Sequence, residues 1–168
     1  MMEAVVAIAI IALAIVGLAG DYPLTMAAIA TIVTGAAILL EGGAFAHARA
    51  RQEFNSGLSA EFLGAVGGVI LGILALMGVT TITLLSVAVL VYGITFLLAG
   101  AMNSQAVTTS MDGHLLVGLS VSVLGLLAVI GIVPTTLVLV GLLILGAMSL
   151  FGGSIKGLRL MADTPALR

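Results

Sequence analysis

The sequence contains no cysteine and no tryptophan, and only 7% of its 168 residues are charged. The absence of cysteine excludes a disulfide framework and a thiolate metal centre. A soluble domain usually carries about 25% charged residues, so five basic and seven acidic side chains cannot cover the surface of a soluble monomer. With so few basic residues and a net charge of −2, we expect no nucleic-acid partner.

Apolar residues, by contrast, make up 62% of the chain and occur in long runs. A helix needs about 20 mostly apolar residues to cross a bilayer, so these runs predict an integral membrane protein with the lipid bilayer as its first partner. Six such stretches occur, at residues 4–20, 24–45, 58–78, 82–102, 114–133 and 135–153. Membrane strands would instead alternate apolar and polar residues. We therefore predict one all-α domain, a polytopic transmembrane helical bundle of six helices.

The first stretch allows a second interpretation, a cleaved signal peptide that ends at Ala19-Gly20. A signal peptide begins with a basic segment, whereas this chain begins with Met1-Met2-Glu3. An internal repeat also favours a retained helix, because the first stretch has a counterpart in each of the other repeat units.

The sequence repeats itself with offsets of 58 and 53 residues. The first offset places Gly78 on Gly20, and the second places Gly131 on Gly78. The same offsets align Gly35 with Gly93 and Gly146, Gly42 with Gly100 and Gly153, and Gly72 with Gly125. Periodic self-similarity is typical of repeated structural units. We predict three repeated αα-hairpins at about 4–45, 58–102 and 114–153, followed by a cytoplasmic tail at 154–168.

Each predicted hairpin contains a four-residue turn that joins antiparallel helices. The turns lie at residues 20–23, 78–81 and 131–134. Each begins with Gly, which reaches the left-handed conformation that ends a helix at little cost. Each ends with Pro23, Thr81 or Pro134, residue types that suit the start of the next helix.

The basic residues predict the orientation in the membrane. All of them fall on the side of the predicted bundle that holds both termini: Arg49, Arg51, Lys156, Arg159 and Arg168. The three turns on the other side contain no Lys or Arg. Because Lys and Arg accumulate on the cytoplasmic side of membrane proteins, we expect both termini to be cytoplasmic.

The stretch at 68–100, GVILGILALMGVTTITLLSVAVLVYGITFLLAG, resembles the short repeat of HdeD-like membrane proteins. That repeat has a G-I-L-A-L core, seen here at 72–76, then a turn that often contains Pro and an apolar helix with Gly near its end. The third unit has G-L-L-A-V at 125–129 and Pro134 in its turn, whereas Ala14 replaces the leading Gly in the first unit. The resemblance implies a small six-helix protein of the prokaryotic cytoplasmic (inner) membrane, related to acid resistance, with no enzymatic mechanism attached.

Glycines at regular spacing are the candidates for close helix packing. Gly64, Gly68 and Gly72 recur every four residues in the third stretch. Three further pairs are seven residues apart: Gly35 and Gly42, Gly93 and Gly100, Gly146 and Gly153. Such faces either pack inside the chain or contact a partner, which is a second copy or a larger membrane complex.

Glu41, Thr34 and Thr31 are the candidate polar residues within an apolar stretch, and at 100° per residue they lie within about 80° of one another. One interpretation is a polar stripe that faces an ion or proton path. The other is a carboxylate at the membrane interface beside threonines that donate to backbone carbonyls.

His47 and His114 are both predicted near the cytoplasmic interface. Histidine titrates near pH 6.5, so the pair are candidate pH sensors, or else ordinary interfacial residues. Zinc sites usually show close pairs of ligands, whereas these two residues are 67 positions apart, so we expect no metal. The sequence contains no phosphate-binding loop, nucleophile motif or haem motif. We expect no catalytic residues and no cofactor.

Two function classes follow from these observations. The first is a non-catalytic multi-pass membrane protein, either related to stress or an accessory subunit of a larger complex. The second is a small transporter or channel that uses the polar stripe at Glu41. The first is favoured because transporters usually carry charged residues or broken helices near the membrane midplane.

Overall fold

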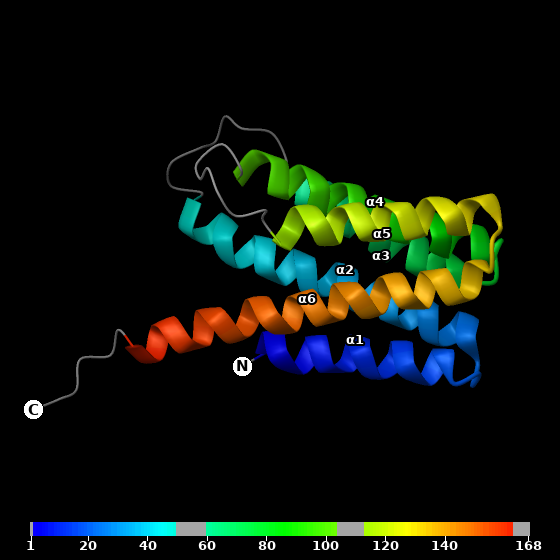
Figure 1. Ribbon diagram of the computed structural model, residues 1–168, viewed down its shortest axis with the longest axis horizontal. Helices are drawn as coiled ribbons and strands as arrows, with labels where there is room; N and C mark the ends of the chain where they lie inside the picture. The colour runs from blue at the N-terminus through cyan, green and yellow to red at the C-terminus, as the bar shows by residue number, and fades with distance from the viewer. Residues whose placement is uncertain (1, 50–59, 104–112, 163–168) are drawn as a thin grey trace, which may run out of the picture.

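The computed structural model describes residues 2–49, 60–103 and 113–162, and these residues form helices joined by tight turns (Figure 1). The six helices are α1 (Met2–Leu18), α2 (Pro23–Arg49), α3 (Ala60–Leu76), α4 (Thr81–Asn103), α5 (Gly113–Ile130) and α6 (Pro134–Ala162). No strand occurs within these three ranges. The all-α prediction and the number of helices are therefore confirmed for the described part of the chain.

The three tight turns gather at one end of the bundle, and the start of α1 and the end of α6 lie toward the other end (Figure 1). Gly20, Gly78 and Gly131 have φ angles of 102°, 83° and 94°. The amide of Gly78 donates to the carbonyl of Ala75, and Gly131 makes the same contact with Ala128, both at 3.1 Å. A second bond runs from the amide of Val79 to the carbonyl of Leu74, and from that of Ile132 to Leu127. The two bonds together form a Schellman helix end, so the predicted role of glycine in these turns is confirmed.

A second residue of each turn also has a positive φ angle, which we did not predict. Tyr22, Thr80 and Val133 have φ angles of 45°, 36° and 40°. Each of their carbonyls accepts the first hydrogen bond of the following helix, from the amides of Met26, Leu84 and Leu137 at 3.0–3.2 Å. These residues hold the left-handed conformation because the chain must reverse within four residues.

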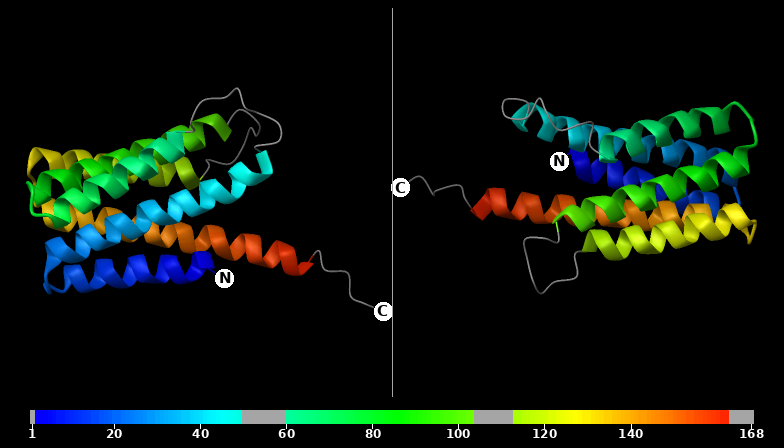
Figure 2. Two further views of the ribbon diagram at one scale, coloured as in Figure 1. Left: turned by 180° about the vertical axis from the view of Figure 1, so that it is seen from behind. Right: turned by 90° about the horizontal axis from the view of Figure 1, so that it is seen from above.

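The helices run lengthwise along the bundle in both views of Figure 2. Their contacts divide them into an inner and an outer set. The inner helices α2, α4 and α6 all start at the turn end, so they run parallel, and each contacts the other two. The outer helices run the opposite way, and each contacts two inner helices. Thus α1 contacts α2 and α6, α3 contacts α2 and α4, and α5 contacts α4 and α6. Contact between the first and last helices closes the ring.

Side chains from the inner helices fill the centre of the bundle. The central residues are Ala27, Leu85 and Val138 in one layer, Thr31, Val89 and Leu142 in the next, and Thr34, Tyr92 and Leu145 in the third, and each is at most 5% exposed. Successive layers are four and three residues apart along each helix, the spacing of a coiled-coil seam. The members of each layer are related by the offsets of 58 and 53.

Three of the glycine contacts occur at equivalent positions of the three hairpins. Gly35 on α2 lies against Val69 on α3, Gly93 on α4 against Ser122 on α5, and Gly146 on α6 against Ile11 on α1. The three partners are themselves related by the offsets of 58 and 53. Each hairpin therefore packs its second helix on the first helix of the next hairpin, around a closed ring.

The helix ends differ from the predicted stretches in a few places. α6 continues to Ala162, so residues 154–162 of the predicted tail are helical. Leu, Lys, Arg, Met and Ala in this segment are good helix formers, which explains the extension. α5 ends at Ile130 instead of residue 133, because Gly131 already begins the turn.

Two of the described helices are long and apolar enough to cross a membrane, judged by length and composition. They are α2 over Pro23–Leu40, with 18 residues, and α4 over Thr81–Ala101, with 21 residues. The apolar segments of the other four helices are shorter: Val5–Leu18, Phe62–Leu76, Leu115–Ile130 and Pro134–Leu150. Four of the six predicted spans thus fall short of the usual length within the described residues.

Candidate functional site

Among the described residues, the largest side chain without exposed surface is that of Tyr92, which lies on α4. Its hydroxyl donates a hydrogen bond of 2.8 Å to the carbonyl oxygen of Thr31 on α2. A Cβ added at Gly35 would lie 2.6 Å from this hydroxyl oxygen, and one added at Gly68 would overlap the ring and the hydroxyl. Two glycines on neighbouring helices therefore provide the space that the tyrosine occupies.

The equivalent positions in the other two hairpins hold residues of different size. Where the second unit has Tyr92, the first has Thr34 and the third has Leu145. Where the second unit has Gly68, the others have Ile10 and Val121, both without exposed surface. A large side chain in the second unit is thus matched by the smallest residue on the facing helix, as close packing requires.

The predicted glycine stripe of α3 packs inside the chain. A Cβ added at Gly64 would overlap the Thr95 side chain on α4, and one at Gly72 would lie 2.7 Å from Ile32 on α2. Together with Gly68, these residues let α3 lie in the groove between two inner helices. Of the two interpretations left open by the sequence, the described contacts of the stripe correspond to packing within one chain.

Glycines on both sides bring α4 and α5 into especially close contact. A Cβ added at Gly118 would lie 2.5 Å from the amide nitrogen of Leu97, and one at Gly125 would lie 2.6 Å from that of Leu90. On α4, the predicted pair Gly93 and Gly100 faces α5 at Ser122 and Leu115. Small residues let two helix backbones approach in this way.

The remaining predicted glycines lie on the two longest helices. Gly146 faces Ile10 and Ile11 on α1, where an added Cβ would lie 3.0 Å from each side chain. This contact is part of the interface between α1 and α6 that closes the ring of helices. Gly42 lies on α2 and Gly153 on α6, but their surroundings fall outside the described residues.

Both predicted threonines satisfy their hydroxyls within α2. Thr31 donates to the carbonyl of Ala27 at 2.7 Å, and Thr34 donates to that of Ala30 at 2.8 Å. The two side chains are buried among apolar neighbours. This is the backbone-bonded arrangement that we gave as the alternative to an ion path.

The predicted ionisable residues lie on helices whose side chains are not described at those positions. Glu41 and His47 are on α2, and His114 is the second residue of α5. Within the part of the chain whose side chains are described, no three His, Cys, Asp or Glu residues gather as metal ligands would. The predictions for these three residues therefore remain predictions.

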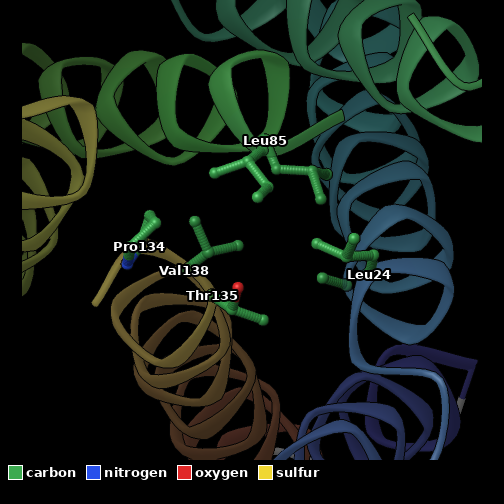
Figure 3. Close-up of a pocket in the computed structure, with 7 residues that line it drawn as sticks. Leu24, Leu85, Pro134, Thr135 and Val138 are labelled. Atoms are coloured by element: carbon green, nitrogen blue, oxygen red, sulfur yellow. The ribbon is translucent and has the colours of Figure 1, made fainter. Parts of the chain in front are cut away.

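A shallow apolar hollow lies between the inner helices at the turn end (Figure 3). The side chains of Leu24, Leu85 and Val138 point toward its centre from three different helices. Its lining also includes Ala27, Ile82, Pro134 and Thr135. The hollow is too narrow to admit a water molecule, so apolar side chains close the centre of the bundle at this end.

Two residues of the tight interfaces had no role in the sequence interpretation. Tyr92 was one of two tyrosines, and the signal that could have identified it was Gly68 in a column that otherwise holds Ile10 and Val121. Ser122 has a buried hydroxyl oxygen without a hydrogen-bond partner among the described residues. Its side chain faces Gly93. The sequence gives no signal for this contact, because a serine at an apolar position of the repeat does not indicate what it packs against.

Comparison of the chain with models of known protein families, with curated proteins and with solved structures found no match.

Proposed function

We propose that this chain is a non-catalytic, multi-pass membrane protein whose three hairpins cross the bilayer six times, and that it acts as a structural or accessory component. The single observation that carries the proposal is the combination of an apolar exterior with a tightly packed, closed interior. The HdeD-like resemblance of residues 68–100 is consistent with this role and adds stress or acid resistance as the process in which we expect it to act.

The exterior supports burial in lipid. Large apolar side chains are exposed on all three outer helices, among them Val5 on α1 at 67%, Leu63 on α3 at 57% and Leu119 on α5 at 54%. The sequence from residue 62 to residue 111 contains no charged residue. A surface of this kind is stable against hydrocarbon but would associate or aggregate in water.

The positions of the charges support one orientation. The charged residues that lie on the described helices are all at the end opposite the turns: Glu3, Glu41, Arg49, Glu61, Lys156 and Arg159. At the turn end the sequence has a single charged residue, Asp21. Under the positive-inside rule, these positions support a cytoplasmic location for the end with both termini. The family resemblance implies that the membrane is the prokaryotic inner membrane.

Cysteine labelling tests the topology, because the natural chain has no cysteine. Single substitutions Val79→Cys in a turn and Ser56→Cys between hairpins are compared in intact cells with a membrane-impermeant maleimide. We expect labelling of Val79→Cys from outside, and labelling of Ser56→Cys only after lysis. Labelling of Ser56→Cys in intact cells would contradict the orientation, and extraction of the wild-type chain by alkaline carbonate would contradict membrane integration.

A transporter that uses Glu41, Thr34 and Thr31 is the second candidate function. The hydrogen bonds of both threonines to their own helix do not favour it, and the centre of the bundle is filled at these layers. Purified protein in vesicles with an imposed proton or cation gradient distinguishes the two candidates. We expect no flux above protein-free vesicles, whereas flux that is lost in Glu41→Gln would favour the transporter.

A further inference from the structure

We infer that this protein fits a thin bilayer and that its lipid partners are phospholipids with short acyl chains. The inference deepens the proposed function and rests on it. Its basis is the length of the apolar outer helices, together with the charged residues that precede them in the sequence and the turns that end them.

The apolar helix α3 has a defined start and end. Glu61 is the second residue of the helix, and Gly78 begins the turn that follows it. Between them lie the 16 residues 62–77, which span about 24 Å at 1.5 Å per residue. Phe62 at one end is 43% exposed and Met77 at the other is 73% exposed, and Val79 in the turn is 53% exposed. The outward apolar surface therefore covers the whole helix and continues one residue into the turn.

The other outer helices repeat this geometry. On α1, Glu3 occupies the position equivalent to Glu61, and residues 4–19 again give about 24 Å before Gly20. In the sequence, Asp112 comes shortly before the apolar segment of α5, Leu115–Ile130, which gives about 24 Å. Three separate helices therefore have apolar lengths below the ~30 Å of a typical hydrocarbon core.

Two adjustments by which other membrane proteins match the thickness of a bilayer do not help these short outer helices. Tilting shortens the thickness that a helix spans, so it increases the mismatch of a short helix. Glutamate has a short side chain and cannot extend far along the helix to reach the interface as lysine does. The bilayer must then thin around the protein, or the protein must reside where the bilayer is already thin.

Reconstitution of the full chain into phosphatidylcholine vesicles tests the inference. The vesicles carry monounsaturated chains of about 14, 16, 18, 20 or 22 carbons, a series that increases the hydrocarbon thickness stepwise. The measurement is the midpoint temperature of thermal unfolding by circular dichroism in each lipid. We expect the highest midpoint with 14 or 16 carbons and a steady fall toward 22 carbons.

A matched pair of variants tests whether the carboxylates set the length. Glu3→Leu combined with Glu61→Leu extends the apolar surface of α1 and α3, so the optimum should shift to longer chains. Asp163→Leu removes one carboxylate after the end of α6 and should leave the optimum unchanged. If the double variant does not insert, the inference is tested by the wild-type protein alone, through the dependence of its unfolding midpoint on acyl-chain length.

An optimum at 20 or 22 carbons, or a profile independent of chain length, would overturn the inference. The same result would leave the proposed membrane function intact, because the protein would still be inserted. Failure of the wild-type chain to insert into any of the vesicles would instead contradict the proposed function itself.

Discussion

The hydroxyl of Tyr92 and the carbonyl of Thr31 meet at 2.8 Å across the interface between α4 and α2, although the two residues are 61 positions apart in the chain. The bond lies in the centre of the bundle, where both residues have no exposed surface. The space for it comes from Gly35 and Gly68 on two facing helices. This arrangement joins the first two hairpins and has no counterpart among the equivalent Leu145 and Thr34.

Tyr92→Phe should lower the free energy of unfolding by about 0.5–1 kcal/mol. The substitution removes one interhelical hydrogen bond while it keeps the ring, and such bonds contribute modestly inside membrane proteins. Unfolding by titration with a denaturing detergent measures the change. The matched control is Tyr22→Phe at the other tyrosine, which is 78% exposed and should unfold like the wild type.

Gly68→Ala should destabilise the protein and Gly67→Ala should not, although the two residues are neighbours on α3. A Cβ at Gly68 would overlap Tyr92, whereas one at Gly67 would meet nothing within 4 Å. We expect Gly68→Ala to destabilise the protein by about 1–3 kcal/mol through overpacking. Gly67→Ala should be neutral or stabilise by up to about 1 kcal/mol through helix propensity. Equal losses in thermal midpoint would contradict the contact with Tyr92.

Tyr92→Leu should rescue Gly68→Val. The single substitution Gly68→Val forces a branched side chain against Tyr92, so we expect little folded protein to accumulate. The double variant carries the residue types of the third hairpin, Leu145 and Val121, and should recover folded yield. Size-exclusion chromatography in mild detergent measures the recovery. A double variant no better than Gly68→Val would show that these two positions do not pack against each other.

Val133→Gly should stabilise the last turn. A β-branched residue at a φ angle of 40° is strained, and such conformations cost of order 1–3 kcal/mol. Glycine adopts this conformation without strain, but it also gives the unfolded chain more conformational entropy, which offsets part of the gain. The free energy of unfolding should therefore rise by about 1 kcal/mol. Ile132→Gly, at the preceding exposed residue without positive φ, should give no increase in thermal midpoint.

Much of the architecture could be predicted because it depends on local and periodic signals. The turns at Gly20, Gly78 and Gly131 could be predicted because glycine at these positions ends the preceding helix. The offsets of 58 and 53 relate the three hairpins to one another from the sequence alone. The ring closure by α1 and α6 was not predicted, because equivalence of units does not specify whether they form a row or a ring.

The contacts of individual side chains were harder to predict than the helices. Thr31 and Thr34 share a helix face with Glu41 whether their hydroxyls face a path or their own backbone, so periodicity cannot distinguish the two cases. The glycines of α3 were recognised as a packing face, but their partners Thr95, Tyr92 and Ile32 follow only from the three-dimensional arrangement. Tyr92 shows the limit most clearly, since a tyrosine in an apolar run is equally compatible with a membrane interface.

The unequal residues around the central axis have a consequence for how such a protein can change over generations. A symmetric assembly of three identical hairpins would place every substitution on its axis three times, and three tyrosines in the layer of Tyr92 would need three matching glycines. One continuous chain removes that constraint, because each hairpin is encoded separately. A large residue in one copy then needs a single compensating change, as Gly68 provides, so joining the copies lets a three-fold fold acquire a single, unrepeated feature at its centre.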